Sequence, residues 1–404
     1  MAIVVQKYGG SSLDGVARIK QVATRITESS HQGYQVVVVV SAMGDSTDNL
    51  LALANKLTSN PDDRELDVLM STGELISATL TAMALNDLGC KAISLTGTQA
   101  GIQTDNQYRK ARIVNVETNR IHQELAKGYV VIVAGFQGIS SSMDITTLGR
   151  GGSDTSAVAL AAALNAKECQ IFTDVDGIYT ADPRIVPKAT KLAEIGYEEM
   201  LELSNYGFKM HPRSIELGSI YKMPILVKSS YSNTSGTLIH KTKLKKSTDV
   251  CGIAADKDVA SITLRSLPNK PGTAAKIFGT LAKSSISVDT IVKNASFENQ
   301  SDLTFTVSRA DLEKSLGIVK SIVLNTSNTS ISSNATLAKV SIVGTNMQKT
   351  PGFAAQVFKT LAKNHIDVLL IATSEIRITC VIPEKQVPTA VVSLHDVFKL
   401  NKAS

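Results

Sequence analysis

An internal repeat in the last third of the chain constrains the fold most strongly. The pattern Pro-Gly-x-Ala-Ala-x-x-Phe-x-Thr-Leu-Ala-Lys-x-x-Ile-x-Val occurs at 271–288 and again at 351–368. A match this close predicts two copies of one structural unit. Alternating, β-type segments precede and follow the two copies: Ala260–Leu264, Leu303–Val307, Lys339–Val343 and Arg377–Ile382. Each unit therefore reads strand–helix–strand–strand–helix, and we expect the two units to pack against each other.

The first 230 residues have a different pattern, in which short β-rich runs alternate with helical segments. The expected strands are Ile3–Gln6, Val36–Val40, Val130–Ala134, Gln170–Phe172 and Ile225–Val227. The run of valines at 36–40 predicts a strand buried on both faces, as in a parallel sheet covered by helices. Helical patterns such as Gly15–Thr27 and Glu65–Asn86 lie between strands, so we expect a three-layer α/β domain. Ligands of open α/β sheets bind beyond the carboxyl ends of the strands.

Length and composition fit a globular chain of two or three domains. The chain has 404 residues, of which 43% are hydrophobic and 19% charged. Its net charge of +6 is not carried by a long basic run, which does not favour nucleic-acid binding. Residues 229–249 break the α/β pattern and predict a domain boundary. The basic piece 241–246 within it is typical of a solvated linker.

The cysteines and histidines predict no metal site. Cys90, Cys169, Cys251 and Cys380 are far apart, form no CxxC pair, and are expected to be free, mostly buried thiols of a reducing compartment. The six histidines form no HxxxH or HExxH pattern. We expect no secretion signal and no membrane span, and therefore a cytoplasmic protein.

The stretch Gln6–Ser12, "QKYGGSS", suggests a phosphate site. Gly9 and Gly10 allow backbone N–H groups to approach an anion closely. Lys7, at the end of the first strand, is a point charge suited to a phosphoryl group in transfer. A strand followed by a tight glycine turn, with no ligand, is the alternative interpretation.

A second glycine-rich stretch, Gly149–Ala157, precedes an Ala-rich helix expected at Thr155–Asn165. Ser153 or Asp154 is the expected N-cap. Glycines at a helix N-terminus open a ready anion site, and Arg150 adds a planar fork suited to a carboxylate. Helix capping alone would explain Asp154 but not Arg150 among three glycines.

Two further segments carry candidate ligand groups. Phe172–Arg184 follows a strand and combines an aromatic ring, hydroxyls, acids and an arginine, which suits a nucleotide base and ribose. A long structured turn is the alternative, because Asp-Gly and Asp-Pro form turns. Ser71–Glu74 places a lone acid at what is expected to be the opening of a helical run, where Glu74 is either a first-turn helix charge or a ligand for an ammonium group.

These pieces together describe a site for ATP and an amino acid, and they resemble one known family. The pattern Val5–Leu13 resembles the aspartate kinase signature. Further segments resemble that family in the same order: Val40–Met43, Ser71–Glu74, Gly149–Ala157 and Thr173–Arg184. The repeated C-terminal unit resembles a tandem pair of ACT domains, so the resemblance covers essentially the whole chain.

The resemblance implies both a domain plan and a reaction. An amino acid kinase (carbamate kinase-like) three-layer αβα domain with a mainly parallel sheet would span 1–240. A linker and leading strand at 241–257 would precede two α+β ACT domains of ferredoxin-like βαββαβ fold at 258–334 and 335–404. The implied enzyme transfers phosphate from ATP, with Mg²⁺, to the β-carboxylate of L-aspartate, giving 4-phospho-L-aspartate for lysine, threonine and methionine biosynthesis.

The family's site residues carry over position by position. The implied catalytic residues are Lys7, Arg150 and Asp154. The implied ATP-binding residues are Lys7, Tyr8, Gly9, Gly10, Ser11, Ser153, Thr173, Asp174, Tyr179, Asp182, Arg184 and Lys209. The implied aspartate-binding residues are Ser41, Thr47, Glu74, Arg150, Gly151, Gly152 and Ser153. In one departure, Lys209-Met210-His211-Pro212 is one residue shorter than the Lys-x-x-His-Pro spacing usual in the family.

The ACT resemblance implies edge-to-edge pairing, a homo-oligomer, and feedback inhibition by lysine, threonine or both. The implied effector-binding residues are Asn269, Pro271, Gly272, Thr273, Ala274, Ser287, Val288, Asp289, Lys293, Phe353, Ala354, Asp367, Val368, Ser374 and Glu375. Many lysine-sensitive relatives carry Asp where this chain has Asn269. A purely structural dimerisation module is the alternative for the repeat.

Two other functions remain open from the sequence. Another amino acid kinase, such as a glutamate 5-kinase or an acetylglutamate kinase, would share the fold but not the Lys-Tyr-Gly-Gly-Ser-Ser form or the ACT-like tail. A catalytically dead amino acid sensor is the alternative that is not an enzyme, and the presence of Lys7, Arg150 and Asp154 argues against it.

Overall fold

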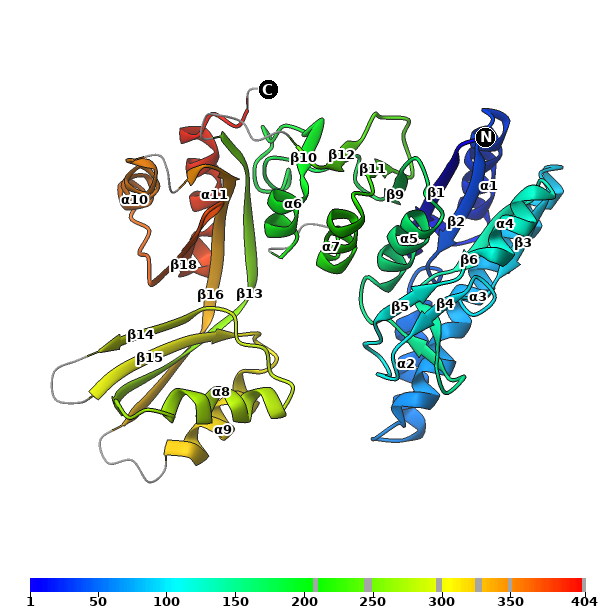
Figure 1. The fold of residues 1–404 in the computed structure, drawn as a ribbon. Coiled ribbons are helices and arrows are strands. Elements are labelled where there is room, and N and C mark those ends of the chain that lie inside the picture. The colour runs from blue at the N-terminus through cyan, green and yellow to red at the C-terminus, as the bar shows by residue number, and fades with distance from the viewer. Residues whose placement is uncertain (206–209, 243–248, 296–299, 324–328, 348–350, 402–404) are drawn as a thin grey trace. The chain divides into compact units, whose positions relative to one another are not determined.

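The chain forms two compact units in the structure, a computed structural model that describes residues 1–205, 210–242, 249–295, 300–323, 329–347 and 351–401. The first unit comprises Met1–Ile178 and Lys191–Lys243. The second comprises Tyr179–Thr190 and Leu244–Ser404. Figure 1 shows the elements of both. The predicted domain limits stay a prediction, to which the structure adds that Tyr179–Thr190 folds with the second unit.

The first unit is built on an eight-stranded sheet in the order β10-β12-β11-β9-β1-β2-β6-β3. Neighbouring strands are parallel, apart from the antiparallel pair β11–β12. Its strands are β1 (Ile3–Tyr8), β2 (Gln35–Val40), β3 (Ala92–Leu95), β6 (Val130–Ala134), β9 (Cys169–Thr173), β10 (Glu194–Gly196), β11 (Ile225–Ser229) and β12 (Thr237–His240). All five strands expected from the sequence are present, and the mainly parallel sheet is confirmed. Strand β12 was missed, because it lies inside the predicted boundary segment.

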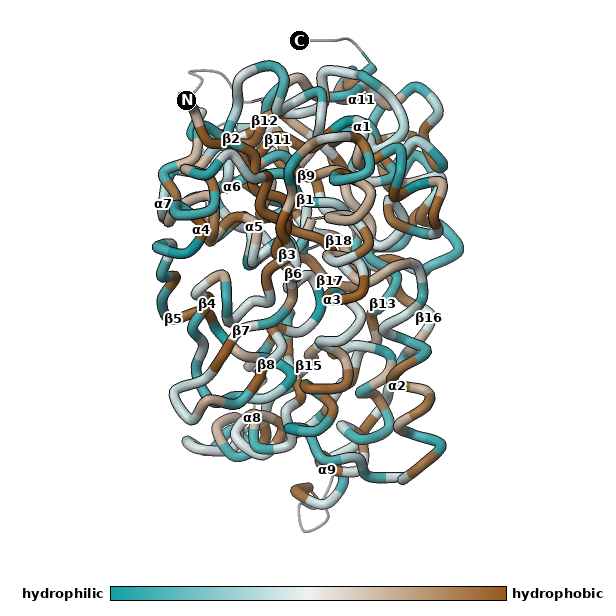
Figure 2. The backbone as a smooth tube through the Cα atoms, turned by 90° about the vertical axis from the view of Figure 1, so that its right-hand side faces the viewer, coloured by the Kyte–Doolittle hydropathy of each residue, from teal (hydrophilic) through white to brown (hydrophobic). Residues whose placement is uncertain are grey.

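Helices cover both faces of this sheet. They are α1 (Val16–His31), α2 (Ser46–Leu57), α3 (Asp63–Asp87), α4 (Asn119–Ala126), α5 (Gly152–Ala163), α6 (Tyr197–Ser204) and α7 (Pro212–Tyr221), with a short 3-10 helix η1 (Gly10–Leu13) after β1. On one face, alternate β2 valines pack with apolar side chains of α1 and α3. The other β2 valines, Val37 and Val39, are also fully buried, on the side where α5 lies against β1 and β2. The hydrophobic colouring on these central strands is visible in Figure 2.

A smaller sheet, β5-β4-β7-β8, belongs to the same unit. Its strands are β4 (Ile102–Thr104), β5 (Ile113–Val116), β7 (Gln137–Ser140) and β8 (Ile145–Thr147). Strands β7 and β8 form an antiparallel hairpin. The chain runs from β8 through Leu148–Gly151 directly into α5, so this small sheet sets where the second glycine-rich stretch begins.

The second unit confirms the repeat. Its elements are β13 (Asp249–Pro268), α8 (Thr273–Lys283), β14 (Ile291–Ala295), β15 (Gln300–Val307), α9 (Leu312–Val323), β16 (Ser330–Thr345), α10 (Phe353–Lys363), β17 (Leu370–Ser374), β18 (Arg377–Pro383), a 3-10 turn η3 (Glu384–Gln386) and α11 (Val387–Val397). They form one antiparallel sheet, β14-β15-β13-β16-β18-β17, in which the two copies are joined through their long first strands.

The long strands β13 and β16 are shared between the copies. The second half of β13 pairs with β15 of its own copy, while its first half, 249–256, pairs with 339–345 of β16. Conversely, the first half of β16, 330–334, pairs with 261–265 of β13. Each copy thus gains an edge strand from the other, which joins the two into one hydrogen-bonded sheet.

Two predictions about helix starts are wrong. Helix α5 begins at Gly152 instead of Thr155, and its N-cap is Gly151 in the left-handed conformation (φ 68°), with no side-chain cap. Glycine reaches that conformation at little cost, so no hydroxyl or carboxylate is needed there. Helix α3 begins at Asp63, capped by Asp62, so Glu74 lies in the helix interior and does not open the helix.

Helix α3 is also the one helix of the described segments that is long and apolar enough to span a membrane. Half of its most apolar window is buried inside the fold, as in core helices of globular domains.

Candidate active site

The candidate site lies where parallel strands of the large sheet end. Lys7 and Tyr8 close β1, Ser41 follows β2 and Thr173 closes β9. Neighbouring loops meet at this edge because the strands run side by side, so sequence motifs far apart come together.

The glycine turn after β1 packs directly against the loop after β2. The Ser41 N–H donates to the Tyr8 carbonyl (3.1 Å), and the Gly44 N–H donates to the Gly10 carbonyl (3.1 Å). A Cβ on Gly10 would lie 2.6 Å from the Ala42 carbonyl oxygen, too close for any side chain. The two loops are therefore held together by backbone groups, and the glycine is required by the close approach.

Lys7 and Asp154 join the two glycine-rich stretches. The Lys7 Nζ lies 2.6 Å from Asp154 Oδ1, and both side chains are nearly buried, at 12% and 10% exposure. Asp154 is in the first turn of α5, where an acidic side chain interacts favourably with the helix dipole. The contact is an ion pair without hydrogen-bond geometry. Lysine and aspartate thus lie together beside a helix N-terminus that has no side-chain cap.

The α5 N-terminus is shaped by glycines on either side of Arg150. Gly149 and Gly151 both have positive φ, 77° and 68°. Arg150 is exposed on the turn between them, while Gly152 and Ser153 are buried. An exposed guanidinium beside a helix N-terminus is suited to a carboxylate.

Glu74 presents an unsatisfied carboxylate oxygen. Its side chain is 3% exposed in the middle of α3. Its Oε1 accepts from the Ala42 N–H (3.1 Å), whereas its Oε2 has no hydrogen-bond partner among the described residues. Burial raises the pKa of the Glu74 carboxyl from 4.5 to about 7, although the Ala42 hydrogen bond opposes the shift. A buried acceptor without a partner suits an incoming ammonium donor.

The remaining aspartate candidates lie on the loop and helix after β2. Ser41 and Thr47 are both half-buried, and Thr47 is in the first turn of α2. Ser11, in η1, is exposed, and its carbonyl accepts from the Tyr231 hydroxyl (2.9 Å). All three hydroxyls therefore belong to segments that directly follow β1 or β2.

Tyr8 is placed differently from the expectation for an ATP-binding side chain. It is fully buried, its ring stacks on Phe172 with centroids 4.7 Å apart, and its hydroxyl donates to Gln6 Oε1 (3.2 Å). Burial raises the pKa of the Tyr8 phenol far above its ordinary value. The ring is a core group that joins β1 to β9, so only the Tyr8 backbone remains for a ligand.

The nucleotide candidates are divided between the units. Thr173 and Asp174 belong to the first unit, where the Thr173 hydroxyl donates to Asp174 Oδ1 (3.0 Å). Tyr179, Asp182 and Arg184 belong to the second unit, where Arg184 is paired with Asp182 (2.7 Å). Their part in the site stays a prediction, and Lys209 lies outside the described residues.

Sequence reasoning missed two residues that border the site. His211 packs against the α5 N-cap, because a Cβ on Gly151 would lie 2.3 Å from the histidine Cβ. Its Nδ1 caps α7, and burial lowers the pKa of the imidazole. Asp67 is fully buried in α3, two turns before Glu74. Its seven-residue spacing from Glu74 was the one available signal, because residues at that spacing share a helix face.

No group of three or more His, Cys, Asp or Glu side chains that could hold a metal ion occurs within the described segments. Mg²⁺ in kinases keeps several waters and is bound by one or two carboxylates together with substrate phosphates. Asp154, a single carboxylate paired with Lys7 at the start of α5, fits that mode of binding. The four cysteines are free; Cys169 and Cys380 are buried and the other two are half-buried.

In the second unit, some effector candidates contact one another. The Lys293 Nζ donates to Asn269 Oδ1 (2.8 Å), and Asp289 pairs with the buried Lys339 of β16. Pro271, Gly272, Ala354, Ser287, Asp367 and Glu375 are exposed, whereas Thr273, Ala274, Val288, Val368 and Ser374 are half-buried. Gly272 and Gly352 are the N-caps of α8 and α10, both left-handed and without a side-chain cap.

Phe353 corrects the effector set. Its side chain is 8% exposed, belongs to the core of the second copy and stacks on Phe398 with centroids 4.9 Å apart. It is a packing residue, so its side chain does not face an effector.

Comparisons with known proteins agree with this geometry. The model of the amino acid kinase family matches residues 2–229, and the ACT domain model matches 262–321 and 340–398. An aspartokinase from Bacillus sp. (strain MGA3) is 45% identical over 403 residues, which are 99% of this chain and 98% of the relative.

Two solved structures resemble the whole chain. E. coli aspartokinase III in complex with aspartate and ADP (R-state) is 25% identical with a TM-score of 0.82, over 98% of this chain and 99% of that one. The same E. coli enzyme in complex with lysine and aspartate (T-state) has a TM-score of 0.76, with the same identity and coverage.

Proposed function

The chain belongs to the amino acid kinase family and is an aspartate kinase, and from that premise we propose how its residues divide the work. The proposed reaction transfers the γ-phosphoryl group of ATP to the β-carboxylate of L-aspartate and yields 4-phospho-L-aspartate. The observation that carries the proposal is the Lys7–Asp154 ion pair of 2.6 Å, which joins the two glycine-rich motifs.

Lys7 stabilises the charge of the phosphoryl group in transfer. Its ammonium lies at the end of β1, next to the glycine turn whose backbone faces the same edge. Asp154 holds that ammonium in place and orients the reacting groups. A strong base is unnecessary because the attacking β-carboxylate is already ionised at neutral pH. Catalysis then consists of positioning and charge neutralisation, as phosphoryl transfer generally requires.

Aspartate is bound by groups that match its own charges. The unpartnered Oε2 of Glu74 accepts from the substrate ammonium. Arg150 and the α5 N-terminus bind the α-carboxylate. Ser41, Thr47, Gly151, Gly152 and Ser153 line the same pocket.

The nucleotide is proposed to bind along the β1 and β9 ends. Gly9, Gly10 and Ser11 hold phosphates, and Thr173 and Asp174 face the nucleoside. From the sequence resemblance, Tyr179, Asp182, Arg184 and Lys209 are also proposed to bind the nucleotide. Mg²⁺, when bound with ATP, would neutralise phosphate charge beside Asp154.

We also propose feedback control by lysine, threonine or both at the ACT domains. The E. coli relative that was solved with lysine supports an amino acid effector. The proposed effector positions lie at Asn269–Ala274, Ser287–Asp289 and Lys293 in the first copy. In the second copy they lie at Ala354, Asp367–Val368 and Ser374–Glu375. The same proposal includes a cytoplasmic homo-oligomer, paired through the ACT domains, that acts in lysine, threonine and methionine biosynthesis.

Lys7→Ala tests the catalytic assignment. We expect turnover to fall by about a hundredfold or more, with a much smaller change in the KM for aspartate, because Lys7 acts on the transition state. Lys167→Ala is the matched control, since Lys167 precedes β9 at the opposite edge of the sheet. A pure rise in KM with unchanged kcat would refute the role of Lys7.

A substrate panel tests the reaction itself. ATP turnover with aspartate, glutamate and N-acetylglutamate should be largest with aspartate. Preferred turnover of either glutamate compound would contradict the proposed substrate, and no turnover with any of them would favour the sensor alternative.

A further inference from the structure

We infer that Asp67 is a positioning residue for Arg150. Its buried carboxylate clamps the two segments, at Thr147 and Arg109, on which the turn that carries Arg150 rests. The inference rests on the proposed function, because it takes Arg150 as the group that binds the aspartate α-carboxylate.

Asp67 makes an unusually complete set of hydrogen bonds for a residue with no exposed surface. The Thr147 hydroxyl donates to its Oδ1 (2.6 Å) and the Thr147 N–H to its Oδ2 (2.8 Å). The Arg109 N–H donates to both oxygens, at 3.1 and 2.9 Å. One side chain of α3 thereby holds the end of β8 and the loop before β5 in fixed register.

The Arg109 contact reaches the Arg150 turn through Gly149. Arg109 has a left-handed backbone (φ 65°), and its N–H is the group that Asp67 binds. A Cβ on Gly149 would lie only 2.9 Å from the Arg109 carbonyl oxygen. Gly149 therefore packs against the Arg109 carbonyl, and Asp67 holds the backbone N–H of the same residue.

The Thr147 contact reaches the same turn along the chain. Thr147 is the last residue of β8 and stands three positions before Arg150. Leu148, which follows it, is held by its N–H to the Phe136 carbonyl (2.9 Å) and by its carbonyl to Arg213 Nη1 (3.0 Å). Only Gly149 separates this anchored stretch from Arg150, so a shift at Thr147 moves the guanidinium.

The free-energy cost of burying the Asp67 carboxylate supports a role for this residue beyond packing. No ion pair to Asp67 occurs within the part of the chain that the structure describes, and burial raises the pKa of its carboxyl against the effect of its hydrogen bonds. A buried carboxylate is costly unless every lone pair is used. Buried polar groups that are fully satisfied rigidify the segments they join.

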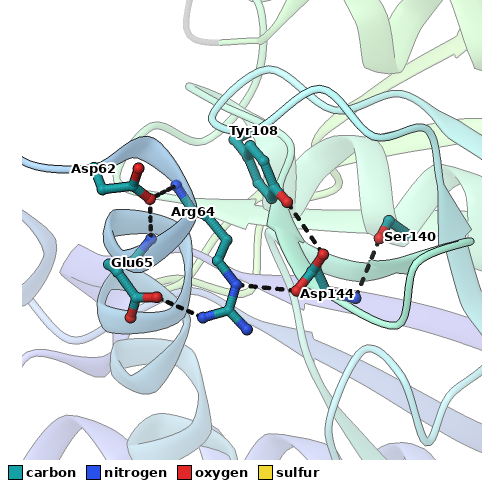
Figure 3. A network of polar contacts seen from close by, with 6 residues as sticks. All are labelled: Asp62, Arg64, Glu65, Tyr108, Ser140 and Asp144. Atoms are coloured by element: carbon teal, nitrogen blue, oxygen red, sulfur yellow. Dashed lines mark hydrogen bonds and ion pairs between the residues drawn. The ribbon is translucent and has the colours of Figure 1, made fainter.

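Asp144 offers a matched control from the same elements (Figure 3). It also links α3 to the β7–β8 hairpin, but at the hairpin turn and not at the end next to Arg150. Its carboxylate accepts from Arg64 Nε (3.0 Å) and from the Tyr108 hydroxyl (3.1 Å). Loss of this link should disturb the attachment of the hairpin to α3 without displacing the Arg150 turn.

The test compares Asp67→Asn, Arg150→Ala, the double variant and Asp144→Asn in the full-length enzyme. Asparagine keeps the size of Asp67 but has only one side-chain oxygen. The Thr147 and Arg109 donors, which now bind two carboxylate oxygens, would have to share it. We expect Asp67→Asn to raise the KM for aspartate about tenfold to hundredfold, as a displacement of about 1 Å in a binding group does. The KM for ATP should stay unchanged, as should all constants of Asp144→Asn.

The double variant separates positioning from general damage. If Asp67 acts through Arg150, Asp67→Asn adds no further rise in aspartate KM once Arg150 is alanine. Additive effects, or equal losses for both substrates, would mean a merely structural role and overturn the inference. An unchanged aspartate KM in Asp67→Asn, with a raised one in Arg150→Ala, would overturn it while leaving the proposed function intact.

An unchanged aspartate KM in Arg150→Ala would instead overturn the proposed role of Arg150. If Asp67→Asn does not fold, Thr147→Val removes only the hydroxyl donor and keeps the side-chain shape. We then expect a smaller rise in aspartate KM with ATP unaffected, and no rise would overturn the inference.

Discussion

Glu74→Gln should stabilise the enzyme at alkaline pH, because the fold holds this carboxyl where its charge is unfavourable. The pKa of Glu74 is raised from 4.5 to about 7 by burial. A folded-state pKa above the unfolded value means that the folded chain binds the proton more tightly. Stability therefore falls as pH rises from about 4.5 to about 7, and the whole penalty is present above pH 7.

The size of the effect follows from that shift. Each pKa unit is equivalent to about 1.4 kcal/mol, so the ionised Glu74 costs on the order of 3 kcal/mol above pH 7. Glutamine keeps the oxygen that accepts from the Ala42 N–H and carries no charge. For a unit of this size, 3 kcal/mol corresponds to a rise of roughly 6 to 12 °C in the melting temperature.

Thermal unfolding of wild type and Glu74→Gln at pH 5 and pH 8 is the assay. We expect the variant to melt higher at pH 8 and the difference to shrink towards pH 5, where the folded wild-type carboxyl is protonated. Glu65→Gln, an exposed change in the same helix, is the control variant. If Glu74→Gln melts at or below wild type at pH 8, the reasoning is refuted. Separately, the KM of Glu74→Gln for aspartate should rise, because the acceptor for the substrate ammonium is lost.

Two further predictions concern the glycine turn after β1 and the proposed effector site of the ACT repeat. Gly10→Ala should lower kcat/KM for both substrates about tenfold or more, because its Cβ would lie 2.6 Å from the Ala42 carbonyl oxygen. Gly9→Ala should lose less in the same steady-state assay, because its Cβ would meet the Lys7 Nζ at 3.6 Å and the Phe172 carbonyl oxygen at 3.9 Å, which are ordinary contacts. Asn269→Asp should strengthen inhibition by lysine in activity titrations, because a carboxylate pairs more strongly than an amide with an effector ammonium. Unchanged inhibition in the titration would contradict the proposed effector site.

The parts of the fold that follow from short-range patterns were predictable. The valine run marked the central strand β2, and the repeat at 271–288 and 351–368 marked two equal units. The exchange of strand halves between β13 and β16 was not predictable, because it depends on pairing across some 80 residues and no local pattern records it. The start of α5 was misplaced because glycine is a weak helix former, and a left-handed Gly151 replaces the expected side-chain cap.

The candidate site could be proposed where a motif carried its own chemistry, as in the two glycine-rich stretches, whose Lys7 and Asp154 the structure brings together. It was only partly predictable in α3, where Glu74 was a candidate from its motif but Asp67 was missed, because both acids reverse the usual rule of polar outside and apolar inside. Leu75, Ile76 and Met83 are exposed, while Asp67 and Glu74 are buried. A pattern search therefore places the acids on the wrong face.

The reversal in α3 has a physical reason that connects fold to function. Three residues on its buried face, spaced by about one turn, each hold a different loop of the site. Asp67 holds Thr147 and Arg109, the Ser71 carbonyl accepts from Gln137 Nε2 (2.8 Å), and Glu74 holds the Ala42 N–H. Apolar residues at 67 and 74 would pack more stably but could not hold the backbone N–H groups of Thr147, Arg109 and Ala42. Functional sites are where local sequence rules are expected to fail, and α3 departs from them where Asp67 and Glu74 hold the segments next to Arg150 and Ser41.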